Sequence, residues 1–558
     1  MKNIRIGEVL LQSGAITEEQ LQQALQKQKE DSGKKLLGAV LIEMGYVTER
    51  QMLTALSQKL QHPLIELDTY QVDLTAVEKI PKQLASKYGL IAIDTEGAAL
   101  KVAVSDPLNF YAIEDIRQIV NQPLAICLAE SRSIQSAIEY YYAEIDAKLA
   151  ASSANTFAVQ EQIAVEEDDS GDEDAPVVKL LNSLLLRGYS TGTSDIHIEA
   201  AESQTLVRMR VDGILVDYVS VAKSLHPSLI ARIKILANLD IAEKRLPQDG
   251  HFKVTLDGSQ MNIRVSVIPT AYGEKAVLRY LTTNTLIDRS GQFGMSDQNY
   301  QKMLAMLQNP HGIIYFTGPT GSGKTTTLYM ILEHLARQPV NISTIEDPVE
   351  RNIPKVNQMQ VNNTAGLHFE NGLSSLLRQD PDIIMVGETR DNETAAISVR
   401  AAITGHLVLS TLHTNDAISS IVRLEDMEIE PYLIANSVVG VVAQRLVKKV
   451  CPHCGYAYAP DEAERAALKD DRITSVRRGK GCHLCNHTGY KGRTAVHEMV
   501  AIDGPIRRMI TARAPVDEIF AYARQKQGMV TLKEELLRLV RDGVTTVEEM
   551  LKLTYYAD

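Results

Sequence analysis

A glycine-rich segment at residues 318–326 has the residue types that hold a nucleotide phosphate. It reads GPTGSGKTT and fits G-x-x-x-x-G-K-[ST] at every fixed position. Such a loop turns backbone N–H groups toward phosphate oxygens at the positive end of a helix. Its lysine reaches the β- and γ-phosphates, and its hydroxyl residue can ligate Mg²⁺, here Thr325. The expected nucleotide-binding residues are Gly318, Pro319, Thr320, Gly321, Ser322, Gly323, Lys324, Thr325 and Thr326.

The flanks of this loop have the periodicity that a phosphate loop requires. The apolar run Ile313–Phe316 predicts a strand before it, and residues 326–335 predict a helix after it. A glycine-rich turn with a chance lysine would need neither flank. The chain is therefore predicted to bind a nucleoside triphosphate.

Carboxylates follow two further apolar segments. Glu346, Asp347 and Glu350 come 22–26 residues after Lys324, and Glu388 ends the apolar run that begins at Asp382. An ATPase needs one carboxylate to orient or deprotonate the attacking water and another to support Mg²⁺. A single carboxylate after a strand is usually a cap, so the order of the segments carries the prediction.

Two histidines, His406 and His413, flank another apolar run. A histidine at a strand edge is commonly a structural group with its hydrogen bonds satisfied. In this order of motifs it is also a candidate sensor of the γ-phosphate.

Four of the five cysteines form two C-x-x-C pairs with 27 residues between them. Four soft thiolates suit tetrahedral Zn²⁺, and a closed four-ligand site is structural because it leaves no position for water. Buried thiols without metal are the alternative, and disulfides are disfavoured in a reducing compartment. Cys127 lies in an apolar run that predicts a buried, inert thiol. The predicted zinc ligands are Cys451, Cys454, Cys482 and Cys485, with His453, His483 and His487 nearby.

The composition is that of a mixed-charge globular chain of several domains. Its 558 residues carry a formal net charge of -12, which argues against sequence-independent binding of nucleic acid. No run of about 18 apolar residues occurs, and the polar N-terminus does not have the pattern of a secretory signal. A cytoplasmic protein is expected.

An internal repeat with an offset of 31 residues opens the chain. Residues 5–14 recur as 36–45, and residues 16–25 recur as 47–56. Each copy predicts a short helix, a turn ending in glycine, a threonine cap (Thr17 or Thr48) and a second amphipathic helix. The two copies are expected to pack on one another.

The order and the residues of these motifs resemble those of the secretion ATPases that drive type IV pilus assembly and type II secretion. In this resemblance Gly318–Thr325 is Walker A, Thr344–Glu350 the Asp box, Asp380–Arg390 Walker B and Thr404–Thr414 the His box. Segments 194–199, 208–213, 245–250 and 272–281 match the domain before the motor core. The four-cysteine insert and segments 528–532 and 543–549 match the extension-motor branch. The likeness covers nearly the whole chain.

The resemblance implies a multidomain α/β fold, with a RecA-like P-loop ATPase core preceded by an α+β (PAS-like) domain and a mostly helical N-terminal repeat domain. The expected divisions are 1–145 for the N-terminal domain, 146–175 for an acidic flexible linker, 176–285 for the α+β domain, 286–448 for the core, 449–495 for the zinc insert and 496–558 for a C-terminal helical region.

The resemblance also implies residue roles. Glu350 matches the catalytic glutamate, Glu388 the Walker B acid, and His406 and His413 the His box. Arginines of the preceding domain are expected at the γ-phosphate, with Arg264 and Arg279 as the best matches and Arg208 and Arg210 as weaker ones. Ion pairs on a strand face are the alternative for all four.

In some pilus-assembly ATPases a duplicated element like this one binds cyclic di-GMP. The first copy matches that element closely, whereas the second has Leu36 where arginine is expected. Lysine at 34 or 35 does not reproduce the bidentate fork of arginine. Ligand binding and a purely structural repeat both stay open. The candidate contacts are Arg5, Gly7, Gly14, Gln28, Gly38 and Gly45.

The resemblance finally implies a cytoplasmic homo-hexamer, peripheral at the inner membrane, that uses ATP, Mg²⁺ and Zn²⁺ and acts on an inner-membrane platform protein to assemble a pilus. A type II secretion motor shares every motif, and the repeat favours the pilus. A nucleic-acid translocase and an idle nucleotide-binding scaffold are the other hypotheses. The acidic charge argues against the first, and intact Lys324, Glu350 and Glu388 argue against the second.

Overall fold

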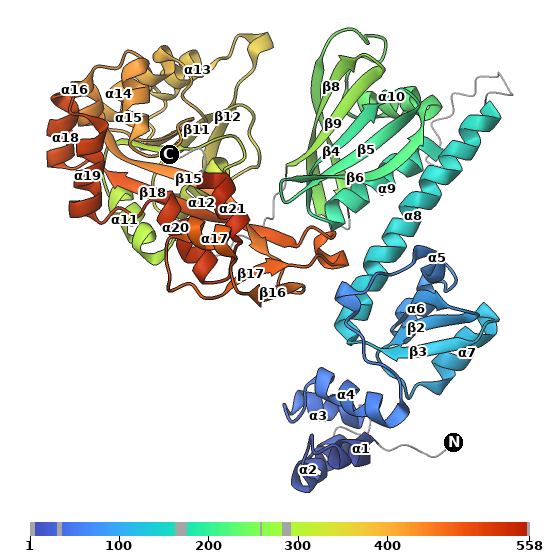
Figure 1. The fold of residues 1–558 in the computed structure, drawn as a ribbon. Coiled ribbons are helices and arrows are strands. Elements are labelled where there is room, and N and C mark those ends of the chain that lie inside the picture. The colour runs from blue at the N-terminus through green and yellow to red at the C-terminus, as the bar shows by residue number, and fades with distance from the viewer. Residues whose placement is uncertain (1–5, 31–35, 162–175, 257–258, 282–291, 555–558) are drawn as a thin grey trace. The chain divides into compact units, whose positions relative to one another are not determined.

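The computed structural model describes residues 6–30, 36–161, 176–256, 259–281 and 292–554 (Figure 1). The chain divides into two compact units. One comprises residues 1–260, 264–279 and 480–489, and the other comprises 261–263, 280–479 and 490–558. The predicted multidomain α/β fold is confirmed. No described helix is long and apolar enough to cross a membrane.

The repeat forms four helices, α1 (Ile6–Gln12), α2 (Glu18–Glu30), α3 (Leu37–Glu43) and α4 (Glu49–Leu60). Their shared core is built from residues that are equivalent in the two copies, namely Val9 and Val40, Leu10 and Leu41, Ile16 and Val47, and Ala24 and Ala55. Both predicted threonine caps form. The Thr48 hydroxyl accepts from Gln51 N at 3.2 Å, and that of Thr17 accepts from Gln20 N at 3.3 Å.

A small three-stranded sheet with helices follows the repeat. Strand β2 pairs antiparallel with β1 and parallel with β3. The elements are η1 (Leu67–Thr69), α5 (Leu74–Val77), α6 (Lys82–Tyr88), β1 (Leu90–Glu96), β2 (Ala99–Val104), α7 (Phe110–Val120), β3 (Leu124–Leu128) and α8 (Ser131–Glu161).

The long helix α8 enters the segment that was predicted to be a flexible linker. Residues 146–161 are helical, because this stretch is rich in alanine, the strongest helix former. The acidic run 166–174 lies outside the described residues. The first half of the predicted linker is therefore corrected to helix.

A six-stranded sheet with the order β6-β5-β4-β9-β8-β7 comes next. Along its central strands apolar residues such as Ile196, Ile198 and Val207 are buried, and charged residues alternate with them on the other face. The elements are α9 (Pro176–Ser190), β4 (Thr193–Ala200), β5 (Gln204–Val211), β6 (Ile214–Ala222), η2 (Lys223–Leu225), α10 (His226–Leu236), β7 (Gln248–Leu256), β8 (Ser259–Thr270) and β9 (Gly273–Leu281).

The second unit is built on a seven-stranded sheet with the order β12-β11-β13-β14-β10-β15-β18, parallel except for β18. The elements are α11 (Asp297–Leu307), β10 (Gly312–Thr317), α12 (Lys324–Leu335), β11 (Ile342–Glu346), β12 (Val356–Gln360), η4 (Asn363–Ala365), α13 (Phe369–Leu376), β13 (Ile383–Val386), α14 (Asn392–Ile403), β14 (Leu407–Leu412), α15 (Ser419–Asp426), α16 (Pro431–Ser437), β15 (Val438–Val450) and β18 (Tyr490–Ala501).

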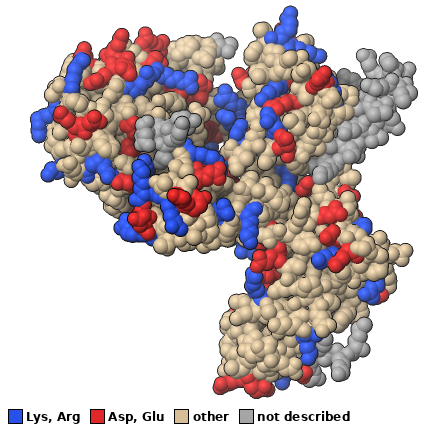
Figure 2. All heavy atoms as spheres, viewed as in Figure 1, with Lys and Arg blue, Asp and Glu red and all other residues tan. Residues whose placement is uncertain are grey.

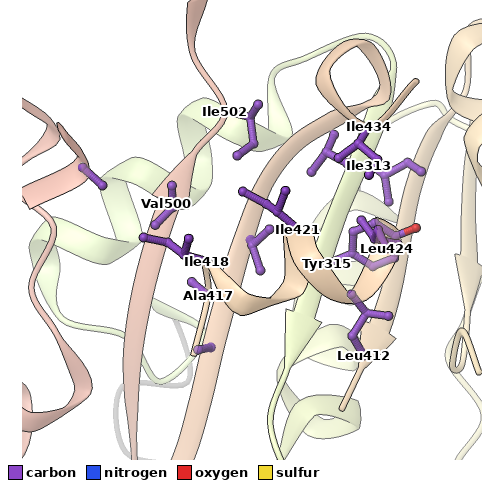
Figure 3. Close-up of a cluster of buried hydrophobic side chains, with 14 of the residues drawn as sticks. Ile313, Tyr315, Leu412, Ala417, Ile418, Ile421, Leu424, Ile434, Val500 and Ile502 are labelled. Atoms are coloured by element: carbon purple, nitrogen blue, oxygen red, sulfur yellow. The ribbon is translucent and has the colours of Figure 1, made fainter. Parts of the chain in front are cut away.

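The central strands of this sheet are apolar along their whole length because helices cover both faces. Every residue of β10, β13 and β14 is buried. On one face, side chains of β10 meet those of α15 and α16, among them Tyr315, Leu424 and Ile434 (Figure 3). This packing fixes the strand that enters the phosphate loop.

The cysteine segment is an excursion between two paired strands of that sheet. It contains β16 (Gly455–Tyr458), α17 (Glu462–Leu468), β17 (Val476–Gly479) and η5 (His483–Cys485). The chain then returns as β18, which pairs antiparallel with β15. The predicted helical region follows as α18 (Gly504–Thr511), α19 (Val516–Gln527), α20 (Leu532–Arg541) and α21 (Val547–Thr554).

Candidate functional site

The phosphate loop connects β10 to α12 in the predicted strand–loop–helix arrangement. Gly318, Gly321 and Gly323 have φ values of +146°, +79° and +86°, which favour glycine. A Cβ on Gly318 would also lie 2.5 Å from the carbonyl oxygen of Gln444. The loop therefore needs glycine for its backbone conformation, and at position 318 also for space.

Lys324 begins α12 and lies over its own loop. Its Nζ donates to the carbonyl oxygens of Gly318 at 2.6 Å and Pro319 at 3.2 Å. Burial lowers the pKa of Lys324 to about 8, and the positive charge of Arg445 adds to this, whereas Glu388 opposes it. Both of these acceptors are neutral carbonyl oxygens, and a nucleotide phosphate would supply an anionic partner.

Two polar residues of β15 lie beside the loop at Gly318, and sequence reasoning missed both. Gln444 Nε2 donates to the carbonyl oxygen of Ser322 at 2.9 Å. Arg445 donates to the carbonyl oxygens of Gln444 at 3.2 Å and Asn415 at 2.8 Å. Burial lowers the pKa of Arg445. The available signal was this pair of polar residues inside the apolar stretch 438–447 of the strand.

The strand order places the carboxyl ends of β11, β13, β14 and β10 side by side at one end of the strands. Glu388 follows β13 there, and its Oε2 lies 2.6 Å from Arg390 Nε and 3.7 Å from His413 Nε2. Burial lowers the pKa of His413, and the charge of Lys324 lowers it further. The structure therefore brings Lys324, Glu388 and His413 together.

His406 lies at the opposite end of the strands, before the amino end of β14. It precedes β14 and His413 follows it, so a strand of six residues, roughly 20 Å long, separates them. His406 Nδ1 lies 2.9 Å from the carbonyl oxygen of Ala401 in the preceding turn. The structure does not place His406 with the other candidate residues.

The three carboxylates of the Asp box have different surroundings. Glu346 is only 2% exposed, and its Oε1 accepts from Thr344 at 2.5 Å and Gln358 at 3.1 Å. Asp347 and Glu350 are exposed at the carboxyl end of β11. Asp347 and Glu388 line one cavity of about 290 Å³. Glu346 is thus a buried anchor, and the other two carboxylates are accessible to a ligand.

The four candidate arginines lie on strands of the six-stranded sheet. Arg279 Nε lies 2.7 Å from Asp195 Oδ1, and Arg210 Nε lies 3.8 Å from Asp195 Oδ2. Arg208 pairs with Glu199 at 2.8 Å. Arg264 is exposed. The first three thus have the ion pairs that the alternative interpretation expects, and a contact of any of the four with nucleotide stays a prediction.

The four paired cysteines form the cluster that their spacing predicted. All four are buried, and their Sγ atoms lie within 4.8 Å of one another. Cys482 and Cys485 have Sγ atoms 3.6 Å apart, close to the edge of a tetrahedron with Zn–S bonds of about 2.3 Å. The Cys485 sulfur also accepts from the backbone N–H groups of Cys482 at 3.2 Å and Gly489 at 3.3 Å. This donor set fits a structural zinc ion.

The glycines of the repeat have structural explanations. A Cβ on Gly7 would lie 2.7 Å from Leu21 Cδ1, and one on Gly38 would lie 2.8 Å from Met52 Sδ. Gly14 and Gly45 follow the first helix of each copy with φ of +71° and +72°. Gln28 is half-buried on α2, and Arg5 lies outside the described residues. The glycines therefore do not by themselves require a ligand.

The fold and site define a P-loop ATPase core, with the phosphate loop, an acid and a histidine at one edge of a parallel sheet. Residues 170–552 match the family model of the type II/IV secretion system protein, and residues 60–148 match that of the MshEN domain. The chain belongs to the type II/IV secretion ATPase family.

Full-length relatives come from two kinds of apparatus. The chain is 38% identical to the type IV pilus assembly ATPase PilB of Myxococcus xanthus over 98% of both chains. It is 37% identical to the type II secretion system ATPase E of Vibrio cholerae over 86% of this chain and 97% of that one. The solved ATPase DotB of Legionella pneumophila has the same core fold, with a TM-score of 0.51 and 21% identity over 70% of this chain and 98% of that one.

Proposed function

We propose that this chain is the ATPase motor of type IV pilus assembly. The observation that carries the proposal is the gathering of Lys324, Glu388 and His413 at the carboxyl edge of the sheet, in a chain similar over its whole length to a pilus assembly ATPase. ATP is the substrate, and phosphate-loop backbone groups and Lys324 bind its phosphates.

Each candidate residue has a proposed task. Glu350 orients and deprotonates the attacking water, and Glu388 with the Thr325 hydroxyl holds Mg²⁺, which neutralises charge on the phosphates when bound. His413 lies 3.7 Å from Glu388 and reports the state of the γ-phosphate to β14. Arg264 and Arg279 reach the γ-phosphate from the preceding domain. His406 has no part in hydrolysis here, since it lies at the other edge of the sheet.

The motor works as a homo-hexamer at the cytoplasmic face of the inner membrane, where it is held by protein partners. Hydrolysis moves the α+β domain against the core, and this movement is passed to an inner-membrane platform protein. A type II secretion motor is the close alternative, because the Vibrio cholerae ATPase is nearly as similar to this chain as the Myxococcus xanthus one.

The platform protein is the readout that separates these two machines. Tagged chain, cross-linked in membranes of its source cells in the presence of ATP, should retain the platform protein of the pilus, identified by mass spectrometry. The Lys324→Ala variant serves as the nucleotide-dependence control. Recovery of a type II secretion platform protein instead would assign the chain to secretion.

A nucleic-acid translocase is disfavoured by charge. The net charge is -12, and on the face shown in Figure 2 lysine and arginine are interspersed with aspartate and glutamate. Nucleic-acid grooves instead carry a basic track. Stimulation of ATP hydrolysis by DNA would revive this alternative.

We also propose that the N-terminal repeat binds cyclic di-GMP. The two copies are built alike, since a Cβ on Gly7 would meet Leu21 and one on Gly38 would meet the equivalent Met52. They would therefore present related halves to a ligand that itself has two identical halves. Arg5 and Gln28 contribute the polar contacts of the first copy.

Calorimetric titration with cyclic di-GMP should show micromolar or tighter binding, weakened about 10- to 100-fold by Arg5→Ala through loss of a charged hydrogen bond. Leu36→Arg should tighten it by restoring the missing arginine of the second copy. Arg50→Ala is the matched control, because Arg50 is an exposed arginine of the repeat paired with Glu66. A flat titration at high ligand concentration makes the repeat purely structural.

A further inference from the structure

A buried tyrosine connects the helix of the phosphate loop to the backbone of Glu350. Tyr329 lies on α12, five residues after Lys324, and is only 2% exposed. Its hydroxyl donates to Oε2 of Glu346 and accepts from the backbone N–H of Glu350 at 3.1 Å. One phenol therefore joins α12, the end of β11 and the loop that carries Glu350.

The carboxylate of Glu346 sets the direction of this hydrogen-bond chain. It is buried and accepts from Thr344 and Gln358 as well as from the phenol. A buried carboxylate must have such donors. The phenol proton of Tyr329 is therefore committed to the hydrogen bond with Glu346 Oε2. Burial and the nearby charge of Glu346 both raise the pKa of Tyr329. The lone pairs of the phenol oxygen are thereby left to accept from Glu350.

The loop on either side of Glu350 is fixed by β12. Gln360 Oε1 accepts from the backbone N–H of Val349 at 3.1 Å, and Gln358 Oε1 accepts from that of Ile353 at 2.7 Å. These two bonds fix the loop to the edge strand β12. The phenol instead ties Glu350 to α12, the helix that begins with Lys324.

We propose that Tyr329 is a positioning residue for ATP hydrolysis, which holds Glu350 in register with the phosphate loop. The inference rests on the proposed roles of Glu350 and Lys324. The distance between the acid that handles the attacking water and the phosphate must be held closely, since a displacement of about 1 Å can cost about 100-fold in rate. Tyr329 sets that distance through a single oxygen atom.

The decisive variant is Tyr329→Phe, which keeps the ring and removes only the hydroxyl. It should lower kcat for ATP hydrolysis about 10- to 100-fold. The dissociation constant for ATP should stay within about twofold of wild type, because no phosphate contact is lost. Turnover is measured by phosphate release, and binding by titration with a fluorescent ATP analogue.

Tyr315→Phe is the matched control. Tyr315 is a fully buried tyrosine on β10, the strand that enters the phosphate loop, and its hydroxyl has no hydrogen-bond partner among the described residues. Its removal should leave kcat unchanged. A similar loss in both variants would show general sensitivity of the core and would overturn the proposal.

A second variant separates positioning from stability. Tyr329→Phe leaves Glu346 with one donor fewer, and the resulting loss of stability could itself lower activity. Tyr329→Phe with Glu346→Gln removes the underbonded charge and should recover Tm, while kcat stays low because the acceptor of the Glu350 N–H is still missing. Recovery of kcat together with Tm would make the tyrosine merely structural.

The outcomes also separate this inference from the proposed function. A wild-type chain without ATP hydrolysis overturns the proposed function and the inference with it. Normal turnover in Glu350→Gln removes the residue that Tyr329 is proposed to position. If wild type hydrolyses ATP, Glu350→Gln does not, and Tyr329→Phe turns over normally, only the inference is wrong.

Discussion

Glu350→Gln should lower kcat for ATP hydrolysis about 10²- to 10⁴-fold, the range that general bases contribute. The carboxylate is exposed at the carboxyl edge of the sheet, and glutamine keeps its shape but accepts no proton. Glu388→Gln should have a loss of similar size, since it removes the charge that is proposed to support Mg²⁺. Both variants should still bind ATP, because neither residue belongs to the phosphate loop. Phosphate release and nucleotide titration measure the two properties separately.

Lys324→Ala should behave differently from these two variants. It removes the buried ammonium that lies over the loop carbonyls, so nucleotide binding itself should weaken. Glu430→Gln is a suitable control, because Glu430 is exposed just before α16 and outside the site. Near-normal turnover in both Glu350→Gln and Glu388→Gln would contradict the assigned roles.

Features set by local sequence were the ones that could be predicted. The phosphate loop is contiguous, and the conformation of each glycine follows from its own backbone. The capping box at Thr48 needs only residues one helical turn apart. The cysteines came from spacing alone, because four thiols in two C-x-x-C pairs have few other uses.

Contacts between distant strands could not be predicted in this way. Gln444 supports Ser322 across 122 residues, and this depends on β15 lying beside β10 in the sheet. Neither the residues around Ser322 nor those around Gln444 specify which strands are neighbours in the sheet. Tyr329 likewise looked like one more apolar position of α12, and its role is visible only once β11 is placed against that helix.

The two histidines show how direction along a strand decides a site. Both flank β14, and the motif does not distinguish them. In a parallel sheet only the carboxyl ends meet the phosphate loop, so His413 reaches Glu388 and His406 does not. The length of the apolar run already implied a separation of roughly 20 Å.

Cys451→Ser should release the metal from the cysteine cluster and leave the phosphate loop able to bind ATP. Wild-type protein purified without chelator should hold about one zinc ion per chain, and the variant close to none, because a structural site needs all four ligands. The cluster lies in an excursion between β15 and β18, whose pairing is made by backbone hydrogen bonds outside it. Loss of zinc should therefore unfold the segment around 451–489 locally.

Metal analysis and hydrogen exchange check the two parts of this expectation. Exchange should rise in the cysteine segment and stay at wild-type level in β10 and β14. Cys127→Ser is the matched control, since Cys127 is a buried cysteine on β3 whose Sγ donates to the carbonyl oxygen of Val102, far in sequence from the cluster. Its zinc content should equal that of wild type. Wild-type protein without zinc would leave four buried thiols and no metal site, and loss of ATP binding in Cys451→Ser would mean that the excursion supports the core after all.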